Sequence, residues 1–206
     1  MTRIRPFRRG DEPALAEICL RTADLGGDAT GVLDDDRIWA EIFVLPYVAR
    51  HPETAFVVEA GEGTDDAHVA GYIVSAPDTA SFETWFRDEW WPVHGARWPK
   101  PDAERSRQDG TLLYAYSRGP GFEPYGATFP AHLHIDLLPE LQGQGWGRRL
   151  VDTLADALRD RGVTGLHLVA GAENARALAF YDRLGFERLD SEPGAQAFGM
   201  RLPRGS

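Results

Sequence analysis

The order of apolar and polar positions predicts a chain of alternating strands and helices. Apolar residues spaced three or four apart are typical of amphipathic helices, and short apolar runs between Gly, Pro and Asp residues are typical of strands. The predicted strands cover residues 4–7, 55–60, 68–76, 131–138, 165–170, 186–189 and 195–202. The predicted helices cover residues 11–21, 34–45, 81–91, 103–116, 174–184 and a segment that runs from the turn at 142–147 to about residue 161.

Prolines and glycines set several of these boundaries. Pro13 lies in the first turn of the helix at 11–21, where its missing N–H costs nothing. Pro46 is expected to stop the helix at 34–45. Strands 55–60 and 68–76 are joined by a polar turn, which predicts a hairpin.

More than fifty residues, 77–129, separate the third and fourth predicted strands, where a short turn would suffice. We interpret this segment as an insertion. Its aromatic side chains are Phe82, Trp85, Phe86, Trp90, Trp91 and Trp98, with His94 between them. We expect most of them to pack the insertion onto the sheet. Two alternatives are a lid over a functional site and a contact surface for a second copy of the chain.

Composition agrees with one globular domain over residues 1–201. Of the 206 residues, 43% are hydrophobic and 26% are charged, as in ordinary folded proteins. The single cysteine, Cys19, excludes an internal disulfide, and the chain shows neither a membrane-spanning run nor a secretory signal. We therefore expect a cytoplasmic protein. Residues 202–206 resemble a protease-tag remnant and are left out of the fold prediction.

A glycine-rich turn between a strand and a helix predicts an anion site. Backbone N–H groups at a helix N-terminus lack partners, and the helix dipole favours negative charge there. Glycine lets phosphates approach the backbone closely. The turn is neither a Walker loop nor a dinucleotide fingerprint, and by itself it could be a plain tight turn. Its residues are Gln142, Gly143, Gln144, Gly145, Trp146, Gly147 and Arg148.

A second motif follows the next strand. Asn174 stands where a helix N-cap belongs, and Tyr181 lies seven residues on, so that both project from one face of the helix. Gly185 is a typical helix terminator. Taken alone, Tyr181 would be interpreted as a core aromatic.

Together, Gln-x-x-Gly-x-Gly at 142–147 and Asn-x-x-Ala-x-x-x-Tyr-x-x-x-Gly-Phe at 174–186 resemble the two hallmarks of the GNAT superfamily of N-acetyltransferases. The resemblance implies a GNAT fold, with a mixed, mostly antiparallel seven-stranded sheet that is flanked by helices and splayed in the middle. It also implies acetyl-CoA as cosubstrate, with pyrophosphate on residues 142–148, pantetheine oriented by Asn174, a thioester carbonyl polarised by backbone N–H groups near Leu137 and Leu138, and Tyr181 as the acid that protonates the leaving thiolate.

A closer resemblance covers nearly the whole chain. Residues 129–139, the Trp/Pro-rich segment around residues 90–92 and the closing strands look similar to bacterial relatives of the C-terminal acetyltransferase-like domain of animal O-GlcNAcase. That domain is regarded as a pseudo-acetyltransferase because its phosphate loop is degraded. The loop is intact in this chain, so the resemblance implies cofactor binding.

The polar residues of the fourth predicted strand are candidates for acceptor chemistry. His132, His134 and Asp136 alternate and so share one face of a regular strand. Three such residues could bind a metal, but this face is expected to abut the CoA channel, and we expect no metal. We predict that Asp136 holds the acceptor or accepts its proton, with His134 as the other candidate. Alternatively, Asp136 only fixes His134 or a backbone N–H. His132 is expected to be structural.

The predicted function is direct acetyl transfer from acetyl-CoA to a primary amine, on a small molecule or a protein lysine. The net charge of −10 argues against nucleic-acid binding and is compatible with a cationic acceptor. A non-catalytic acyl-CoA-binding module and a protein-interaction domain are the alternatives, and a homodimer is possible. Thiol release from acetyl-CoA would separate an enzyme from a binding module.

Overall fold

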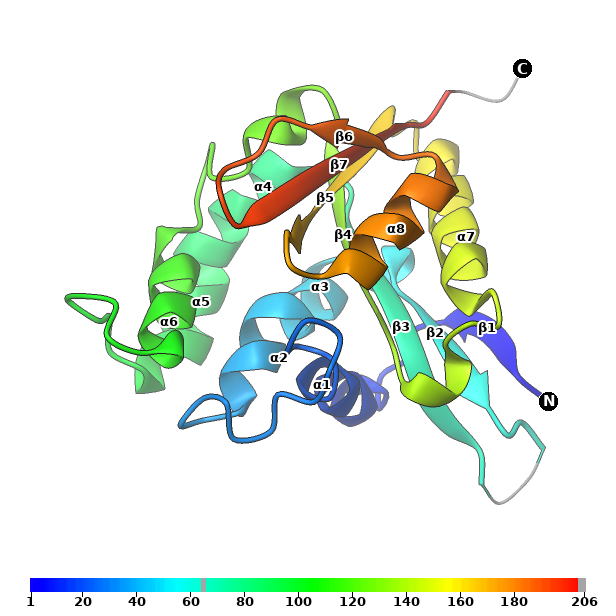
Figure 1. Ribbon diagram of the computed structural model, residues 1–206, viewed down its shortest axis with the longest axis horizontal. Helices are drawn as coiled ribbons and strands as arrows, with labels where there is room; N and C mark the ends of the chain where they lie inside the picture. Colours follow the sequence, from blue (N-terminus) through cyan, green and yellow to red (C-terminus); the bar gives the residue numbers. More distant parts are fainter. Residues whose placement is uncertain (64–65, 204–206) are drawn as a thin grey trace.

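A seven-stranded sheet runs through the centre of the molecule in the computed structural model, which describes residues 1–63 and 66–203 (Figure 1). The strands lie in the order β1-β2-β3-β4-β5-β7-β6. The β4–β5 pair is parallel and the other neighbours are antiparallel. The sheet is therefore mixed and mostly antiparallel, as predicted. The strands are β1 (Arg3–Pro6), β2 (Phe56–Ala60), β3 (His68–Ala76), β4 (Ala131–Leu137), β5 (Gly165–Gly171), β6 (Glu187–Leu189) and β7 (Ala195–Arg201).

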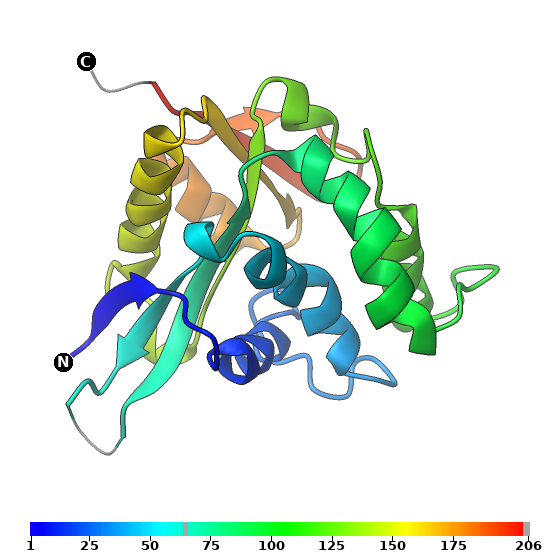
Figure 2. The ribbon, with the colours of Figure 1, turned by 180° about the vertical axis from the view of Figure 1, so that it is seen from behind.

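Helices cover both faces of the sheet (Figures 1 and 2). One core lies between the sheet and α1–α6, and the other lies between the sheet and α7 and α8. The helices are α1 (Glu12–Leu20), α2 (Arg37–Phe43), α3 (Leu45–Arg50), α4 (Thr79–Trp85), α5 (Trp91–His94), α6 (Arg107–Ser117), α7 (Trp146–Asp160) and α8 (Ala175–Leu184).

Strand alternation feeds both cores. In β3, Tyr72 and Val74 belong to the core with α1–α6, whereas Ile73 belongs to the core with α7 and α8. Successive side chains of a strand point to opposite faces, so a strand covered on both sides is apolar throughout. On β4 the same alternation separates Leu133, in the α7 core, from His132 and His134 on the opposite face.

Two boundaries differ from the sequence prediction. The helix predicted at 34–45 is a pair, because α2 ends at Phe43 and Pro46 lies in the first turn of α3 instead of stopping a helix. Proline is tolerated there because first-turn N–H groups have no helical acceptor. Leu202 ends the strand predicted at 195–202 and also begins the suspected tag, but β7 ends at Arg201. Leu202 is 1% exposed and donates its N–H to Thr164 O at 2.9 Å, so it belongs to the folded domain. Residues 204–206 of the suspected tag lie outside the described residues.

The insertion is helical and packs through its aromatic rings, as expected. It contains α4, a π-helical turn (Phe86–Trp90), α5 and α6. Of the six Phe and Trp side chains named above, five are less than a tenth exposed, namely Phe82, Phe86, Trp90, Trp91 and Trp98. Because these rings face the core, packing accounts for most of the aromatic content.

A fully buried ion pair joins this insertion to the rest of the domain. The Arg118 guanidinium, at the end of α6, contacts the Glu83 carboxylate of α4 at 2.7 Å, and both side chains are 1% exposed. Arg118 also donates to Ile42 O of α2 at 3.1 Å. The pair therefore connects two insertion helices to the helical layer that covers the sheet.

We expect Glu83→Gln to lower the free energy of unfolding by roughly 3–5 kcal/mol, because it leaves the Arg118 charge buried without its counter-ion. Urea unfolding followed by circular dichroism measures this change. Asp88→Asn, the same acid-to-amide change in a solvent-exposed pair with Arg87, is the matched control and should have little effect. Equal effects of the two substitutions would contradict the stabilising role of the buried pair.

Candidate functional site

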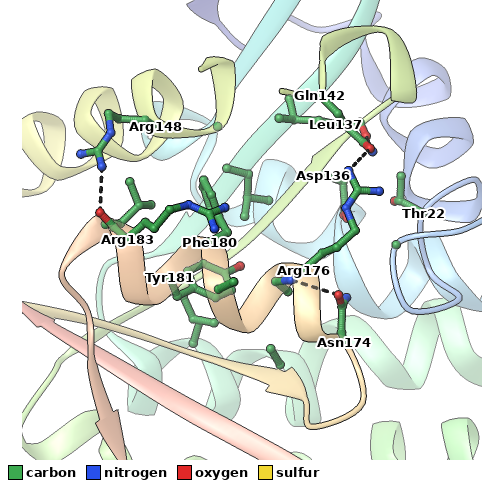
Figure 3. Close-up of a pocket in the computed structure, with 18 of the residues that line it drawn as sticks. Thr22, Asp136, Leu137, Gln142, Arg148, Asn174, Arg176, Phe180, Tyr181 and Arg183 are labelled. Atoms are coloured by element: carbon green, nitrogen blue, oxygen red, sulfur yellow. Dashed lines mark hydrogen bonds between the residues drawn. The ribbon is translucent and has the colours of Figure 1, made fainter. Parts of the chain in front are cut away.

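The strands β4 and β5 diverge, and a cavity opens between them. They pair only at Ala131↔Leu166 and His132↔His167, whereas β4 stays paired with β3 as far as Leu137↔Gly71. Beyond His132 the two parallel strands separate. The resulting cavity has a volume of about 930 Å³ and is lined by β4, β5, the start of α7 and α8 (Figure 3).

Leu137 lies at this cavity, whereas the backbone N–H of Leu138 is used within the sheet. Leu137 lines it, at the β4 edge that faces the gap. Leu138 is not among the lining residues, and its N–H donates to Ala70 O of β3 at 2.9 Å. The Leu138 N–H is therefore not available to polarise a thioester carbonyl, because it is already committed to the sheet.

The glycine-rich turn forms one end of the cavity. Gly145 is the N-cap of α7 with φ +81, a left-handed conformation that favours glycine, and no side chain caps this helix. The first-turn N–H groups of α7 are thus left available. Six of the seven predicted turn residues line the cavity: Gln142, Gly143, Gly145, Trp146, Gly147 and Arg148. The side chain of the seventh, Gln144, turns away and donates to Glu140 O at 2.5 Å.

α8 contributes Asn174 and Tyr181 to the opposite wall. Asn174 caps the helix as predicted, with its Oδ1 accepting the Ala177 N–H at 3.0 Å, so its Nδ2 remains as the group that can contact a ligand. Tyr181 is 8% exposed. Burial, together with the charge of Asp136, raises the pKa of Tyr181, which keeps the phenol protonated.

Two arginines of α8 that the motif analysis did not single out also line the cavity. Arg176 donates to Gln142 Oε1 at 2.8 Å, from α8 to the glycine-rich turn (Figure 3). The carbonyl oxygen of Arg183 accepts from Arg148 at 2.9 Å. Both arginines lie inside the predicted motif at 174–186. Their positive charge, on the helix that faces a predicted anion site, was the signal that could have identified them.

The other end of the cavity lies where the face of β4 that carries His134 and Asp136 meets the segment after α1. Thr22, Leu25 and Gly26 line it beside the two β4 residues. Leu25 has φ +53, which is uncommon for a residue with a side chain and is not readable from sequence. None of residues 77–129, all of which the structure describes, lines this cavity. The insertion therefore forms no part of the wall of this cavity, and its closure over Asp136 stays a prediction.

Asp136 is half-buried and accepts a short hydrogen bond from the Tyr72 hydroxyl of β3. Burial raises the pKa of Asp136, and the hydrogen bond from Tyr72 opposes that rise. A carboxylate with a raised pKa is better matched to proton transfer near neutral pH than an exposed one.

Within residues 1–63 and 66–203, no group of three or more His, Cys, Asp or Glu side chains is arranged to hold a metal ion. His132, His134 and Asp136 share a face of β4, as predicted, but the two histidines bind the Tyr47 hydroxyl through Nε2 and Asp136 binds Tyr72. In the same part of the chain, no helix is long and apolar enough to cross a membrane.

Residues 24–186 match the model of the acetyltransferase (GNAT) family, and the chain belongs to this family. The chain is similar to the crystal structure of SsHAT, with 36% identity and a TM-score of 0.91 over 98% of both chains. The crystal structure of PaiA N-acetyltransferase from Thermoplasma acidophilum, in complex with coenzyme A, shares the fold at 13% identity and a TM-score of 0.58, covering 98% of this chain and 99% of that one.

Curated relatives match over shorter stretches. The [ribosomal protein bS18]-alanine N-acetyltransferase of Escherichia coli (strain K12) is 50% identical over 53 residues, 26% of this chain and 36% of that protein. Mycothiol acetyltransferase of Rhodococcus opacus (strain B4) is 46% identical over 54 residues, 26% of this chain and 18% of that protein. The chain thus spans about a fifth to a third of the length of these two relatives.

We expect the unfolding free energy of Asp136→Asn, relative to that of the parent protein, to increase as pH rises above 3.8. The raised pKa means that the folded parent holds this proton more tightly than the unfolded chain. Its stability therefore falls between the usual Asp value and the raised one, whereas asparagine does not titrate. Unfolding free energies of both proteins between about pH 4 and 8 test this. A difference that stays constant or moves the other way would contradict the raised pKa.

Proposed function

We propose that this chain is an acetyl-CoA-dependent N-acetyltransferase that transfers the acetyl group directly to a primary amine in a ternary complex. One observation carries the proposal: the cavity opened by the divergence of β4 and β5 has an uncapped helix N-terminus at one end and Asp136 at the other, with Tyr181 in its wall. Membership of the GNAT family supports acetyl-CoA as the cosubstrate.

In this proposal the pyrophosphate of acetyl-CoA lies on the turn at 142–148. The free N–H groups of α7 and the helix dipole favour the phosphates, and Arg148 and Arg176 add positive charge. The pantetheine arm follows the unpaired edge of β4 past Leu137, and Asn174 orients it through Nδ2. The arm brings the thioester to the part of the cavity between Tyr181 and Asp136.

Direct transfer needs one base and one acid. Asp136 accepts a proton from the acceptor ammonium, the amine nitrogen attacks the thioester carbon, and the C–S bond breaks as Tyr181 protonates the leaving thiolate. The nitrogen then loses a second proton to become the amide, and this proton returns through water to the Tyr181 phenolate. The Leu137 N–H at the β4 edge polarises the carbonyl as its oxygen gains charge. Cys19 is buried and does not line the cavity, which argues against an acyl-cysteine intermediate.

The acceptor is proposed as a primary amine on a small molecule or a protein. Similar proteins include a ribosomal-protein-alanine N-acetyltransferase and an agmatine N-acetyltransferase. The kinship with O-GlcNAcase-like acetyltransferases stays a prediction from the sequence.

The experiment that tests the proposal measures thiol release from acetyl-CoA with a panel of amines: agmatine, spermidine, a peptide with an N-terminal alanine and a peptide with an internal lysine. Amine-dependent thiol release above the rate with water supports acetyl transfer. Tight CoA binding by calorimetry without release for any amine would favour the non-catalytic binding module instead.

We expect Gly145→Asp to weaken CoA binding by at least tenfold, because it places a side chain and a negative charge where the phosphates bind. Gly162→Asp, after the C-terminal end of α7, is the matched control. Both glycines have positive φ, +81 and +75, and neither has a neighbour within 4 Å of an added Cβ, so backbone strain is similar. Calorimetric affinities that are equal for the two variants would refute the phosphate site.

We expect Tyr181→Phe to lower kcat by roughly 10²-fold while leaving CoA affinity unchanged, because it removes the proton donor but keeps the ring. Steady-state kinetics and calorimetry measure the two effects. An unchanged kcat with chemistry shown to be rate-limiting would exclude the acid role. A normal kcat with poor CoA binding would make Tyr181 a cofactor contact instead.

We expect Asp136→Asn to spare CoA binding and to lower amine turnover, because the amide keeps the size of the side chain but loses its charge. The loss should be largest at pH values where the parent carboxylate is ionised. A pH–rate profile of kcat/KM for the best amine of the panel measures it, and a parallel profile for parent and variant would exclude Asp136 as the base.

A further inference from the structure

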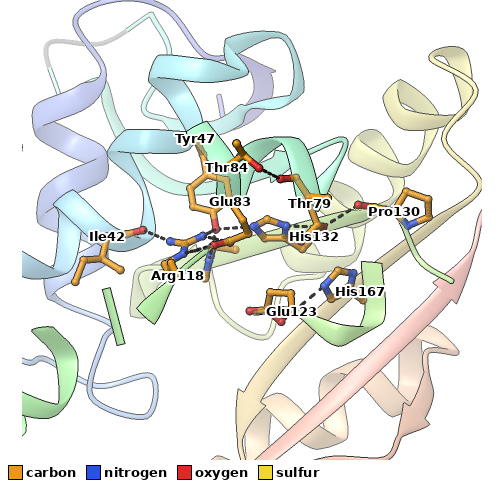
Figure 4. A network of polar contacts seen from close by, with 12 residues as sticks. Ile42, Tyr47, Thr79, Glu83, Thr84, Arg118, Glu123, Pro130, His132 and His167 are labelled. Carbon is orange, nitrogen blue, oxygen red and sulfur yellow. Dashed lines mark hydrogen bonds and ion pairs between the residues drawn. The ribbon is translucent and has the colours of Figure 1, made fainter. Parts of the chain in front are cut away.

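A chain of buried polar groups leads from the cavity into the core behind β4. The Tyr47 hydroxyl of α3, which is fully buried, lies 2.7 Å from Nε2 of His132 and 3.0 Å from Nε2 of His134. His132 reaches further inward to Thr79 of α4 (Figure 4). His134 is the member that lines the cavity. The proposed acetyl transfer assigns no role to this chain.

The inner end of the chain sets the tautomer of His132. Thr79 Oγ1 lies 2.7 Å from Pro130 O and 2.9 Å from Nδ1 of His132. A carbonyl oxygen can only accept, so the single hydroxyl proton of Thr79 is donated to Pro130 O, and Nδ1 of His132 must donate to Thr79. Burial, followed by the charge of Arg118, lowers the pKa of His132 well below its usual value. His132 is therefore neutral, with a bare Nε2.

That result determines the direction of the hydrogen bonds at Tyr47. The hydroxyl donates its one proton to the bare Nε2 of His132. Arg118 Nη2 lies 3.2 Å from Tyr47 Oη and can only donate, so Tyr47 Oη accepts this hydrogen bond. No proton remains for His134, so Nε2 of His134 must donate to Tyr47 Oη. Burial raises the pKa of Tyr47, which keeps the phenol intact.

His134 is consequently held with its proton on Nε2 and a lone pair on Nδ1. Burial and the charge of Arg118 lower the pKa of His134 to about 3, so the ring is neutral at working pH. Among the described residues Nδ1 has no hydrogen-bond partner, and it is not one of the buried polar atoms that lack one. Nδ1 is therefore not fully enclosed, and it belongs to a side chain that lines the cavity.

We propose that Nδ1 of His134 accepts a hydrogen bond from the acceptor amine, and that Tyr47, His132, Thr79 and Arg118 are positioning residues that lock the required tautomer. This inference rests on the proposed function. His134 and Asp136 are two residues apart on one face of β4, about 7 Å along the strand, so one bound amine can contact both.

Asp136 and His134 have different roles at the nitrogen of the acceptor amine. Asp136 takes one proton from the ammonium, and the amine keeps two N–H bonds. His134 accepts one of these as a hydrogen bond, which aims the nitrogen lone pair at the thioester carbon. The N–C bond forms and the C–S bond breaks as Tyr181 protonates the thiolate. The nitrogen sheds its second proton as it becomes the amide, and this proton passes through water to the Tyr181 phenolate, while Asp136 releases the first proton to solvent. Because His134 is weakly basic, it orients the amine and does not store the proton.

The test reads the tautomers directly in the free protein, labelled with ¹⁵N-histidine. Long-range ¹H–¹⁵N correlation spectra distinguish protonated from bare ring nitrogens, and His134→Asn identifies the His134 signals. We expect a proton on Nε2 of His134 and on Nδ1 of His132 between about pH 6 and 8. A proton on Nδ1 of His134, or exchange between its two tautomers, would overturn the proposal.

Tyr47→Phe keeps the ring and removes the bridging hydroxyl. We expect His134 to become a mixture of tautomers and kcat for the best amine of the panel to fall about tenfold, the cost of one well-placed hydrogen bond, with the KM for acetyl-CoA unchanged. Tyr114→Phe is the matched control. Tyr114 packs on Phe43 beside His134, and its hydroxyl has no hydrogen-bond partner among the described residues. A single His134 tautomer and an unchanged kcat in Tyr47→Phe would refute the positioning role.

The two proposals fail separately. The tautomer measurement needs neither cofactor nor turnover, so a wrong tautomer refutes the inference while thiol release by the parent protein still supports acetyl transfer. If the parent releases no thiol with any amine, the proposed function fails, and with it the acceptor contact of His134.

Discussion

The divergence of β4 from β5 is the constraint on which the site depends. Parallel strands that stayed paired would bury every backbone group between them and leave no room for a ligand. Here the pairing stops after His132. The sheet remains continuous because β4 is held by β3 from His132 to Leu137 and β5 is held by β7 along its whole length. The opening therefore costs only the hydrogen bonds of one short interface. It presents a strand edge, a helix N-terminus and two helix-borne side chains to one cavity.

Both cores are needed to keep that opening in place. α7 carries a row of buried leucines, Leu150, Leu154 and Leu158, at intervals of four residues, which packs it against one face of the sheet. Gly147 fits against Phe180 of α8 so closely that an added Cβ would lie 2.9 Å from the ring. The first turn of α7 and the middle of α8 are therefore held in direct contact. This contact fixes the distance between the glycine-rich turn and the helix that carries Tyr181.

The parts of the site that could be predicted were those written in short, ordered motifs. Glycines with positive φ at 145 and 185, the cap at Asn174 and the shared face of His134 and Asp136 all follow from local rules of turns, caps and strand alternation. Leu138 could not be judged from sequence, because its N–H is taken by Ala70 in a neighbouring strand. Leu25 has positive φ in a tight turn closed by hydrogen bonds between Asp24 and Gly27, at a position where turn preferences favour Gly or Asn. The Tyr47 bridge joins residues more than eighty positions apart, and no local pattern signals it.

The insertion contributes buried polar groups behind β4 in addition to its aromatic packing. It lines no part of the cavity, yet it supplies Thr79, Glu83 and Arg118 to the polar chain behind β4. A buried guanidinium cannot lose its proton, so it acts as a permanent donor and a permanent positive charge. Burial first, and then this positive charge, lower the pKa values of His132 and His134, and both rings stay neutral. Glu83 compensates Arg118 without touching either histidine, so the charge can be buried at all. The aromatic packing of the insertion thus excludes water from this ion pair. In our proposal, the buried polar groups behind β4 fix the tautomer of His134 and so orient the acceptor amine.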